Sequence, residues 1–122
     1  LQSFVRVTDY LDEEIASRYL AGTDIGVLDS SVSFNRSSLV TLLAYGFPAI
    51  ATHMPSDLPD GHPLLPIPPR DVAALTTALT ELINCPDKRR QLGETSRVFS
   101  ETLSWQNITQ QHLEIYQSLF GR

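Results

Sequence analysis

The alternation of apolar and polar stretches predicts a complete βαβ unit between Asp24 and Thr52. The apolar run from Ile25 to Leu28 is short, lacks alternation and ends at Asp29, which is typical of a parallel strand covered on both faces. A polar loop follows, and then a helix that is apolar all round except for Thr41. A helix of this kind is expected to be buried.

The ends of this helix carry residues with strong positional preferences. Ser37 or Ser38 can cap the free backbone amides at its start, and Gly46 stands where a left-handed residue would end it. The stretch from Phe47 to Thr52 is then the second strand. Together these signals predict a strand, a buried helix and a parallel strand in that order.

Further strands flank this unit. The β-branched and aromatic content of Ser3 to Val7 predicts one strand, and Leu64 to Pro68 predicts a short strand that its prolines restrict to a sheet edge. The chain therefore predicts an α/β fold, with a parallel sheet of about four strands and helices on both faces. We expect residues 1–122 to form a single partial domain.

Helices are predicted where apolar residues recur at helical spacing. Asp12, Asp71 and Asp87 are expected to cap three of them, and Trp105 is expected to start the last. That last helix has Ile108, Ile115, Tyr116 and Leu119 on one side, with a half-buried His112 on the same stripe. Two groups of charged residues are interpreted as solvated helix faces. They are the acidic pair Glu13 and Glu14, and the basic residues Lys88, Arg89, Arg90 and Arg97.

Composition excludes several classes of function. The formal net charge of −5, with basic residues spread thinly, argues against nucleic-acid binding. His53 and His62 flank a loop, yet no cluster has metal-ligand spacing, so no metal is expected. The single cysteine, Cys85, indicates a reducing compartment and is expected to be a small apolar filler at a helix end.

No apolar segment approaches the roughly 20 residues that cross a bilayer, and no signal peptide is recognisable. A cytoplasmic location is the expectation. Because the chain begins at Leu1 inside what looks like a structured segment, we expect it to be part of a longer protein.

The turn from the first strand to the helix is the candidate site. Backbone amides and the positive end of the helix dipole converge there, so Ser37, Ser38 and the backbone could hold a phosphate, with Arg36 adding a mobile charge. In open α/β sheets ligands lie beyond the carboxyl ends of the strands, where His53 would face the same crevice. The alternative is that the serines only cap the helix and Arg36 is a surface charge.

Motifs along the chain are similar, in order and spacing, to those of a known enzyme family. They are Leu11-Asp12-Glu13-Glu14, Asp24 to Ser30, Ala44-Tyr45-Gly46-Phe47-Pro48-Ala49-Ile50-Ala51-Thr52, Pro69-Arg70-Asp71-Val72-Ala73-Ala74-Leu75, Ser104-Trp105 and Tyr116. The run from Val5 to Arg122 resembles the second half of the carboxyl-terminal domain of GT-B glycosyltransferases, specifically the retaining group 1 family. The resemblance implies a Rossmann-like fold that binds a nucleotide sugar.

The resemblance also implies site residues. Counting back from Gly46, the two glutamates of the family fall on Ser33 and Thr41, so neither carboxylate is present. A variant branch reads Ser-Leu-Arg-Arg-Gly-Ser-Leu-Leu here, which the stretch from Ser33 to Val40 resembles more closely. The implied donor-binding residues are Ser33, Asn35, Arg36, Ser37, Ser38, Leu39, Thr41 and His53. Among them Arg36, Ser37 and Ser38 would face the diphosphate, and Thr41 the ribose.

The function implied is the donor-binding portion of a retaining glycosyltransferase, with a nucleoside-diphosphate sugar as substrate and no metal or other cofactor. Its partner would be an amino-terminal acceptor domain of the same protein. The resemblance is also compatible with peripheral membrane association of that protein. No catalytic residue is assigned in this chain, which is expected to be inactive alone. A non-catalytic binding or scaffold domain and a sugar-nucleotide epimerase are the two alternatives.

Overall fold

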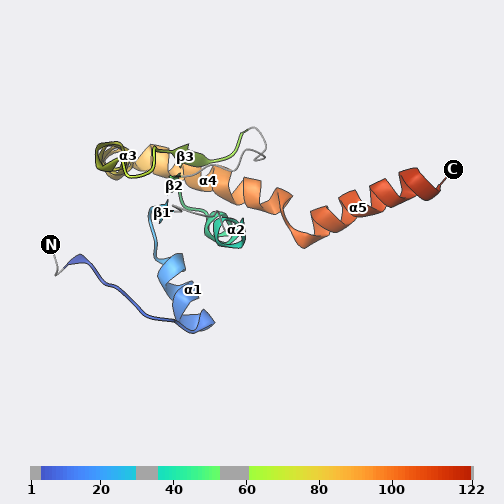
Figure 1. The fold of residues 1–122 in the computed structure, drawn as a ribbon, viewed down its shortest axis with the longest axis horizontal. Coiled ribbons are helices and arrows are strands. Elements are labelled where there is room, and N and C mark those ends of the chain that lie inside the picture. Colours follow the sequence, from blue (N-terminus) through green and yellow to red (C-terminus); the bar gives the residue numbers. More distant parts are fainter. Residues whose placement is uncertain (1–3, 30–35, 53–60, 122) are drawn as a thin grey trace.

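The computed structural model describes residues 4–29, 36–52 and 61–121 of the chain. Within these ranges it has five helices and three strands (Figure 1). In chain order they are α1 (Glu13–Ala21), β1 (Gly26–Leu28), α2 (Arg36–Ala44), β2 (Ala49–Ala51), β3 (Leu64–Pro66), α3 (Val72–Asn84), α4 (Pro86–Thr102) and α5 (Trp105–Phe120).

The three strands form one parallel sheet in the order β1-β2-β3. Gly26 lies opposite Ala49, and Ala49 lies opposite Leu64. The predicted parallel βαβ unit is therefore confirmed, and so is the edge position of β3. Val27 is 44% exposed, so β1 is not covered on both faces as its apolar run predicts.

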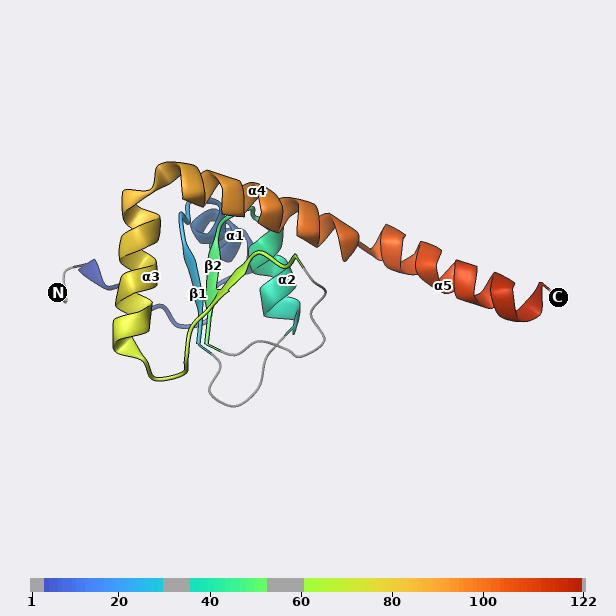
Figure 2. The same ribbon diagram turned by 90° about the horizontal axis from the view of Figure 1, so that it is seen from above.

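Helices cover both faces of the sheet, as the sequence predicts. In Figure 2 the sheet is seen edge-on, with α3 on one face and α2 on the other. Helix α4 runs across the amino ends of the strands, and α1 lies beyond the β1 edge (Figures 1 and 2). No helix of the described residues runs across the carboxyl ends of the strands.

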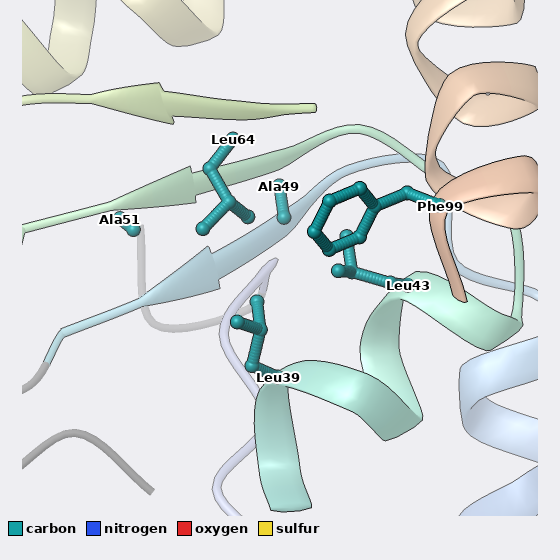
Figure 3. Close-up of a cluster of buried hydrophobic side chains, with 6 residues drawn as sticks. All are labelled: Leu39, Leu43, Ala49, Ala51, Leu64 and Phe99. Carbon is teal, nitrogen blue, oxygen red and sulfur yellow. The ribbon is translucent and has the colours of Figure 1, made fainter. Parts of the chain in front are cut away.

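The core lies between α2, the sheet and α4 (Figure 3). Its buried side chains are Leu39 and Leu43 of α2, Ala49 and Ala51 of β2, Leu64 of β3 and Phe99 of α4. Small residues let the layers approach closely, because a Cβ added at Gly93 would lie only 2.3 Å from the carbonyl oxygen of Gly46. Gly46 has φ +74°, which confirms it as the left-handed residue after α2.

The strand predicted from Ser3 to Val7 is wrong where the structure describes it. Residues 5–9 have no regular structure, and Val5 and Val7 are 65% and 90% exposed. A strand needs a neighbour to bond with, and the described sheet offers these residues none, so β propensity alone does not order them. The described residues consequently contain three strands rather than four.

Helix α2 also differs from its prediction. Leu39 and Leu43 are buried, but Thr41 and Ala44 are exposed, so only one side of the helix is covered. The helix begins at Arg36, which places Ser37 and Ser38 inside the first turn rather than at the cap. The prediction from sequence overestimated the burial of α2, because the outer side of this helix faces α1 across an open cavity.

The helix caps match the predictions only in part. Asp12 directly precedes α1, but its side chain makes no capping hydrogen bond. The Asp71 side chain accepts a hydrogen bond of 2.8 Å from the amide of Ala74, as predicted. The predicted Asp87 cap is wrong, because α4 begins at Pro86 and Asp87 lies in its first turn. Cys85 is exposed between α3 and α4, so it does not fill a gap in the core.

Helix α5 extends away from the rest of the chain (Figures 1 and 2). The structure buries none of its residues, although the sequence places an apolar stripe along one side. His112 is exposed rather than half-buried, with its Nδ1 2.8 Å from the carbonyl oxygen of Ile108.

Candidate carboxyl-edge site

The carboxyl ends of the strands and the amino end of α2 meet at one edge of the sheet (Figure 2). Because α2 carries the chain from β1 back to the parallel strand β2, the helix must begin where β1 ends. Residues 36–38 form its first turn. The backbone amides of this turn and the positive end of the helix dipole therefore lie at this edge, which suits an anionic group.

The structure places the residues assigned from sequence at different points. Arg36, Ser37 and Ser38 are in the first turn of α2. Ser33, Asn35 and His53 lie outside the described residues. Ser38 is exposed in the first turn of α2. Leu39 is only 2% exposed, and its side chain packs in the core.

Thr41 is exposed on the outer side of α2 and lines an open cavity of about 760 Å³ between α2 and α1. The other lining residues are Glu13, Glu14, Ala16, Ser17 and Leu20 of α1, and Tyr45 after α2. Glu14 accepts a hydrogen bond of 2.6 Å from Arg18, whereas Glu13 has no ion pair with the described residues. The cavity thus combines a hydroxyl, an aromatic ring and carboxylates.

Sequence reasoning did not connect Glu13 and Glu14 with Thr41. Both glutamates are exposed, as predicted for a solvated face, but they face a cavity that α2 completes. Glu14 and Thr41 are 27 residues apart in the chain, and their helices meet only through packing, so no local motif signals the contact.

A second cavity of about 170 Å³ lies at the carboxyl edge, between the sheet and α3. Thr52 joins the strand ends there, because its amide donates to the carbonyl oxygen of Leu28 at 3.1 Å and its Oγ1 donates to Asp29 Oδ1 at 3.1 Å. Arg70 also lines this cavity and has φ +61°, a left-handed conformation that is uncommon for a residue with a side chain. Such backbone strain concentrates at binding sites.

The basic cluster of α4 lies away from this edge, and its side chains bond within the fold. Lys88 pairs with Glu81, Arg90 with Asp87 at 3.1 Å, and Arg97 with Glu94 at 2.7 Å. Arg89 donates to the carbonyl oxygens of Leu82 and Ile83 at the end of α3. The hydrogen bond to Glu94 also raises the pKa of Arg97. Each of these four cations therefore has a partner in α3 or α4.

Two further properties concern the described part of the chain. It contains no group of three or more His, Cys, Asp or Glu residues that could hold a metal ion. None of its helices combines the length and the apolar character that a bilayer crossing requires.

The sequence is similar to that of a characterised enzyme. It is 30% identical over 116 residues to the MMP alpha-(1->4)-mannosyltransferase of Mycolicibacterium hassiacum. The matched region covers 91% of this chain and 28% of that protein. The fold matches sucrose-phosphate synthase from Thermosynechococcus elongatus with a TM-score of 0.73 and 24% identity, over 93% of this chain and 30% of that one. The chain is related to the GT-B glycosyltransferases.

This GT-B relationship confirms the family resemblance and the α/β fold predicted from sequence, and the group 1 assignment is consistent with it. No protein-family model matches the chain. The chain spans less than a third of the length of either GT-B relative.

Proposed function

We propose that this chain is the donor-side portion of a glycosyltransferase and that it binds a nucleoside-diphosphate sugar at the carboxyl edge of its sheet. The observation that carries the proposal is the first turn of α2, which begins at this edge in a chain 30% identical to a mannosyltransferase. Backbone amides of that turn would bind the diphosphate, with Arg36, Ser37 and Ser38 contributing from the same turn. A mannosyl donor is the first candidate.

The cavity between α1 and α2 supports a place for the nucleoside. Thr41 offers a hydroxyl to the ribose, and Tyr45 lies on the same wall. Glu13 and Glu14 would repel a phosphate at this cavity, but carboxylates readily accept hydrogen bonds from sugar hydroxyls. The charges therefore favour a nucleotide oriented with its diphosphate at the start of α2 and its hydroxyls toward α1.

The reaction we propose is transfer of the sugar with retention of configuration. Negative charge grows on the diphosphate as it leaves, and fixed helix amides together with Arg36 would stabilise that charge without a metal ion. The acceptor site would belong to a further domain of the same protein, since the matched region is 28% of the mannosyltransferase. Turnover is accordingly not expected from the 122 residues alone.

Calorimetric titration of the chain with GDP-, UDP- and ADP-linked sugars tests donor binding. Arg36→Ala should weaken binding by about 10-fold or more, because hydrogen bonds to charged groups contribute about 1.5–3 kcal/mol. Arg90→Ala is the matched control, since Arg90 pairs with Asp87 on α4 and should leave the affinity unchanged. An unchanged affinity in Arg36→Ala would count against the proposal.

A non-catalytic binding or scaffold domain is the second candidate. It is favoured by Thr41, which stands where the family has a glutamate and offers the cavity no carboxylate of its own. Absence of heat with every sugar nucleotide, together with no protection against thermal unfolding, would support this candidate.

A further inference from the structure

The cavity of about 170 Å³ between the sheet and α3 is separate from the proposed diphosphate site. It opens at the same carboxyl edge, but α3 and α2 lie on opposite faces of the sheet (Figure 2). Pockets for drug-sized ligands have volumes of about 300–1,000 Å³. This cavity therefore has room for a single small ring and not for a nucleotide.

The walls of the cavity are largely apolar. Val27 of β1 lies on the sheet side, Ile67 and Pro68 follow β3, and Val72 and Leu75 belong to α3. Val27 is 44% exposed and Val72 is 76% exposed, so a ligand can reach both side chains. A ligand with a hydrocarbon face would be stabilised by covering them.

Two charged groups of opposite sign also line the cavity. Asp29 accepts a hydrogen bond from Thr52 at Oδ1, and its Oδ2 bonds with none of the described residues. The guanidinium of Arg70 has neither an ion pair nor a hydrogen bond within the described ranges. Asp71 differs from both, because its side chain caps the amide of Ala74. One carboxylate oxygen and one guanidinium can therefore bind a ligand.

The backbone of Arg70 is strained in a way that its visible contacts do not explain. Its φ of +61° crowds the Cβ, whereas glycine adopts this conformation without steric cost. No interaction of the guanidinium with the rest of the described chain offsets the strain. A ligand held by Arg70 at the mouth of the cavity would offset it.

We propose that this cavity binds one neutral sugar ring. A sugar hydroxyl both donates and accepts hydrogen bonds, so one ring can donate to Asp29 and accept from Arg70. The carbon-bound hydrogens of the ring would cover Val27 and Val72. In the reaction proposed above the ring would be the sugar of the donor or the terminal sugar of the acceptor, so this inference rests on the proposed function.

The charges of the cavity disfavour other occupants. An anion would meet the carboxylates of Asp29 and Asp71, and a cation would meet Arg70. An apolar segment of protein would cover Asp29 and Arg70 without offering them hydrogen bonds, which is costly for charged groups. A neutral ring with several hydroxyls satisfies both charges and the apolar walls.

An NMR titration of the 122-residue chain with methyl α-mannoside and with methyl α-glucoside tests the proposal. Saturable shifts are expected at Val27, Arg70 and Val72 with at least one of the two sugars. A dissociation constant in the millimolar range is expected, because the ligand is small and the site is open. Absence of saturable shifts at these residues with both sugars would overturn the proposal.

Arg70→Gly separates binding from stability. Glycine suits the left-handed backbone, so the Tm should stay the same or rise. Loss of the guanidinium should weaken sugar binding by about 10-fold, because hydrogen bonds to charged groups are the stronger ones. A stable Arg70→Gly variant that binds the sugar as well as the wild type does would contradict the proposal.

Val27→Phe tests the cavity itself, because the larger side chain would fill it and should abolish the shifts. Val98→Phe is the matched control, since Val98 is 52% exposed on α4 and does not line the cavity. Equal loss of binding in both variants would count against the site. Arg70→Gly decides the matter if Val27→Phe fails to fold.

GDP-linked mannose distinguishes the two sources of the ring. If it competes with methyl α-mannoside for the cavity, the ring belongs to the donor, and if both bind together, the ring belongs to the acceptor. Plain GDP reports on residues 36–38 alone. GDP binding without sugar binding would refute this inference and leave the donor site standing, whereas sugar binding without GDP binding would refute the donor site.

Discussion

Replacing Gly93 with alanine should destabilise the fold where α4 crosses the turn between α2 and β2. A Cβ at this position would lie 2.3 Å from the carbonyl oxygen of Gly46 and 3.2 Å from its carbonyl carbon. Since Cβ contacts below 3.0 Å essentially do not occur, the two backbones would have to separate by at least about 0.7 Å. Neither can move freely, because β2 behind the turn is fully buried.

Two opposing effects set the size of the loss. Alanine stabilises a helix by about 1 kcal/mol relative to glycine. Overpacking a tight contact costs about 1–3 kcal/mol, and a clash with backbone belongs at the upper end because no side chain can rotate away. We therefore expect a net loss of about 1–2 kcal/mol, or a fall in Tm of about 4–8 °C.

Urea unfolding followed by far-UV circular dichroism measures this loss. The matched control is Gly22→Ala, whose added Cβ would meet its nearest neighbours at 3.6 and 3.8 Å and whose φ of −93° suits any residue. The control should be within about 0.5 kcal/mol of the wild type, or slightly more stable. Equal unfolding free energies for Gly93→Ala and the wild type would refute the account of this crossing.

Three further substitutions test the packing and capping. Ser96→Ala should leave stability unchanged or raise it by up to about 1 kcal/mol in thermal unfolding, because the Ser96 hydroxyl is fully buried and bonds with none of the described residues. Asp71→Ala should cost about 0.5–2 kcal/mol in urea unfolding, since it removes the cap on the amide of Ala74; Asp71→Asn should restore most of it. Leu43→Ala should cost about 2–5 kcal/mol by the same assay, because Leu43 is fully buried against Phe99 and the sheet.

Local signals in the sequence predicted much of this fold. Gly46 ends α2 because only a residue without a Cβ adopts its φ of +74° at no cost. Asp71 starts α3 through its own side chain, and Pro86 separates α3 from α4 because its ring suits the first turn of a helix. The apolar runs of β1 and β2 also predicted their parallel pairing.

Features that depend on distant parts of the chain were not predictable in the same way. Val5 and Val7 have strand-forming side chains, but strand formation requires a neighbouring strand that the described residues do not supply. The periodicity of α5 correctly gave its amphipathic character and said nothing of what covers it. The cavity shared by Glu13 and Thr41 arises from packing of α1 beside α2, which local sequence does not encode.

The position of the anion site is the central claim, and an amide-resolved NMR titration of the chain with a nucleoside diphosphate tests it most directly. We predict saturable shifts for the amides of residues 36–38, in the first turn of α2, with smaller shifts near Thr41. Shifts confined to the basic residues of α4, or none at millimolar nucleotide, would contradict the account.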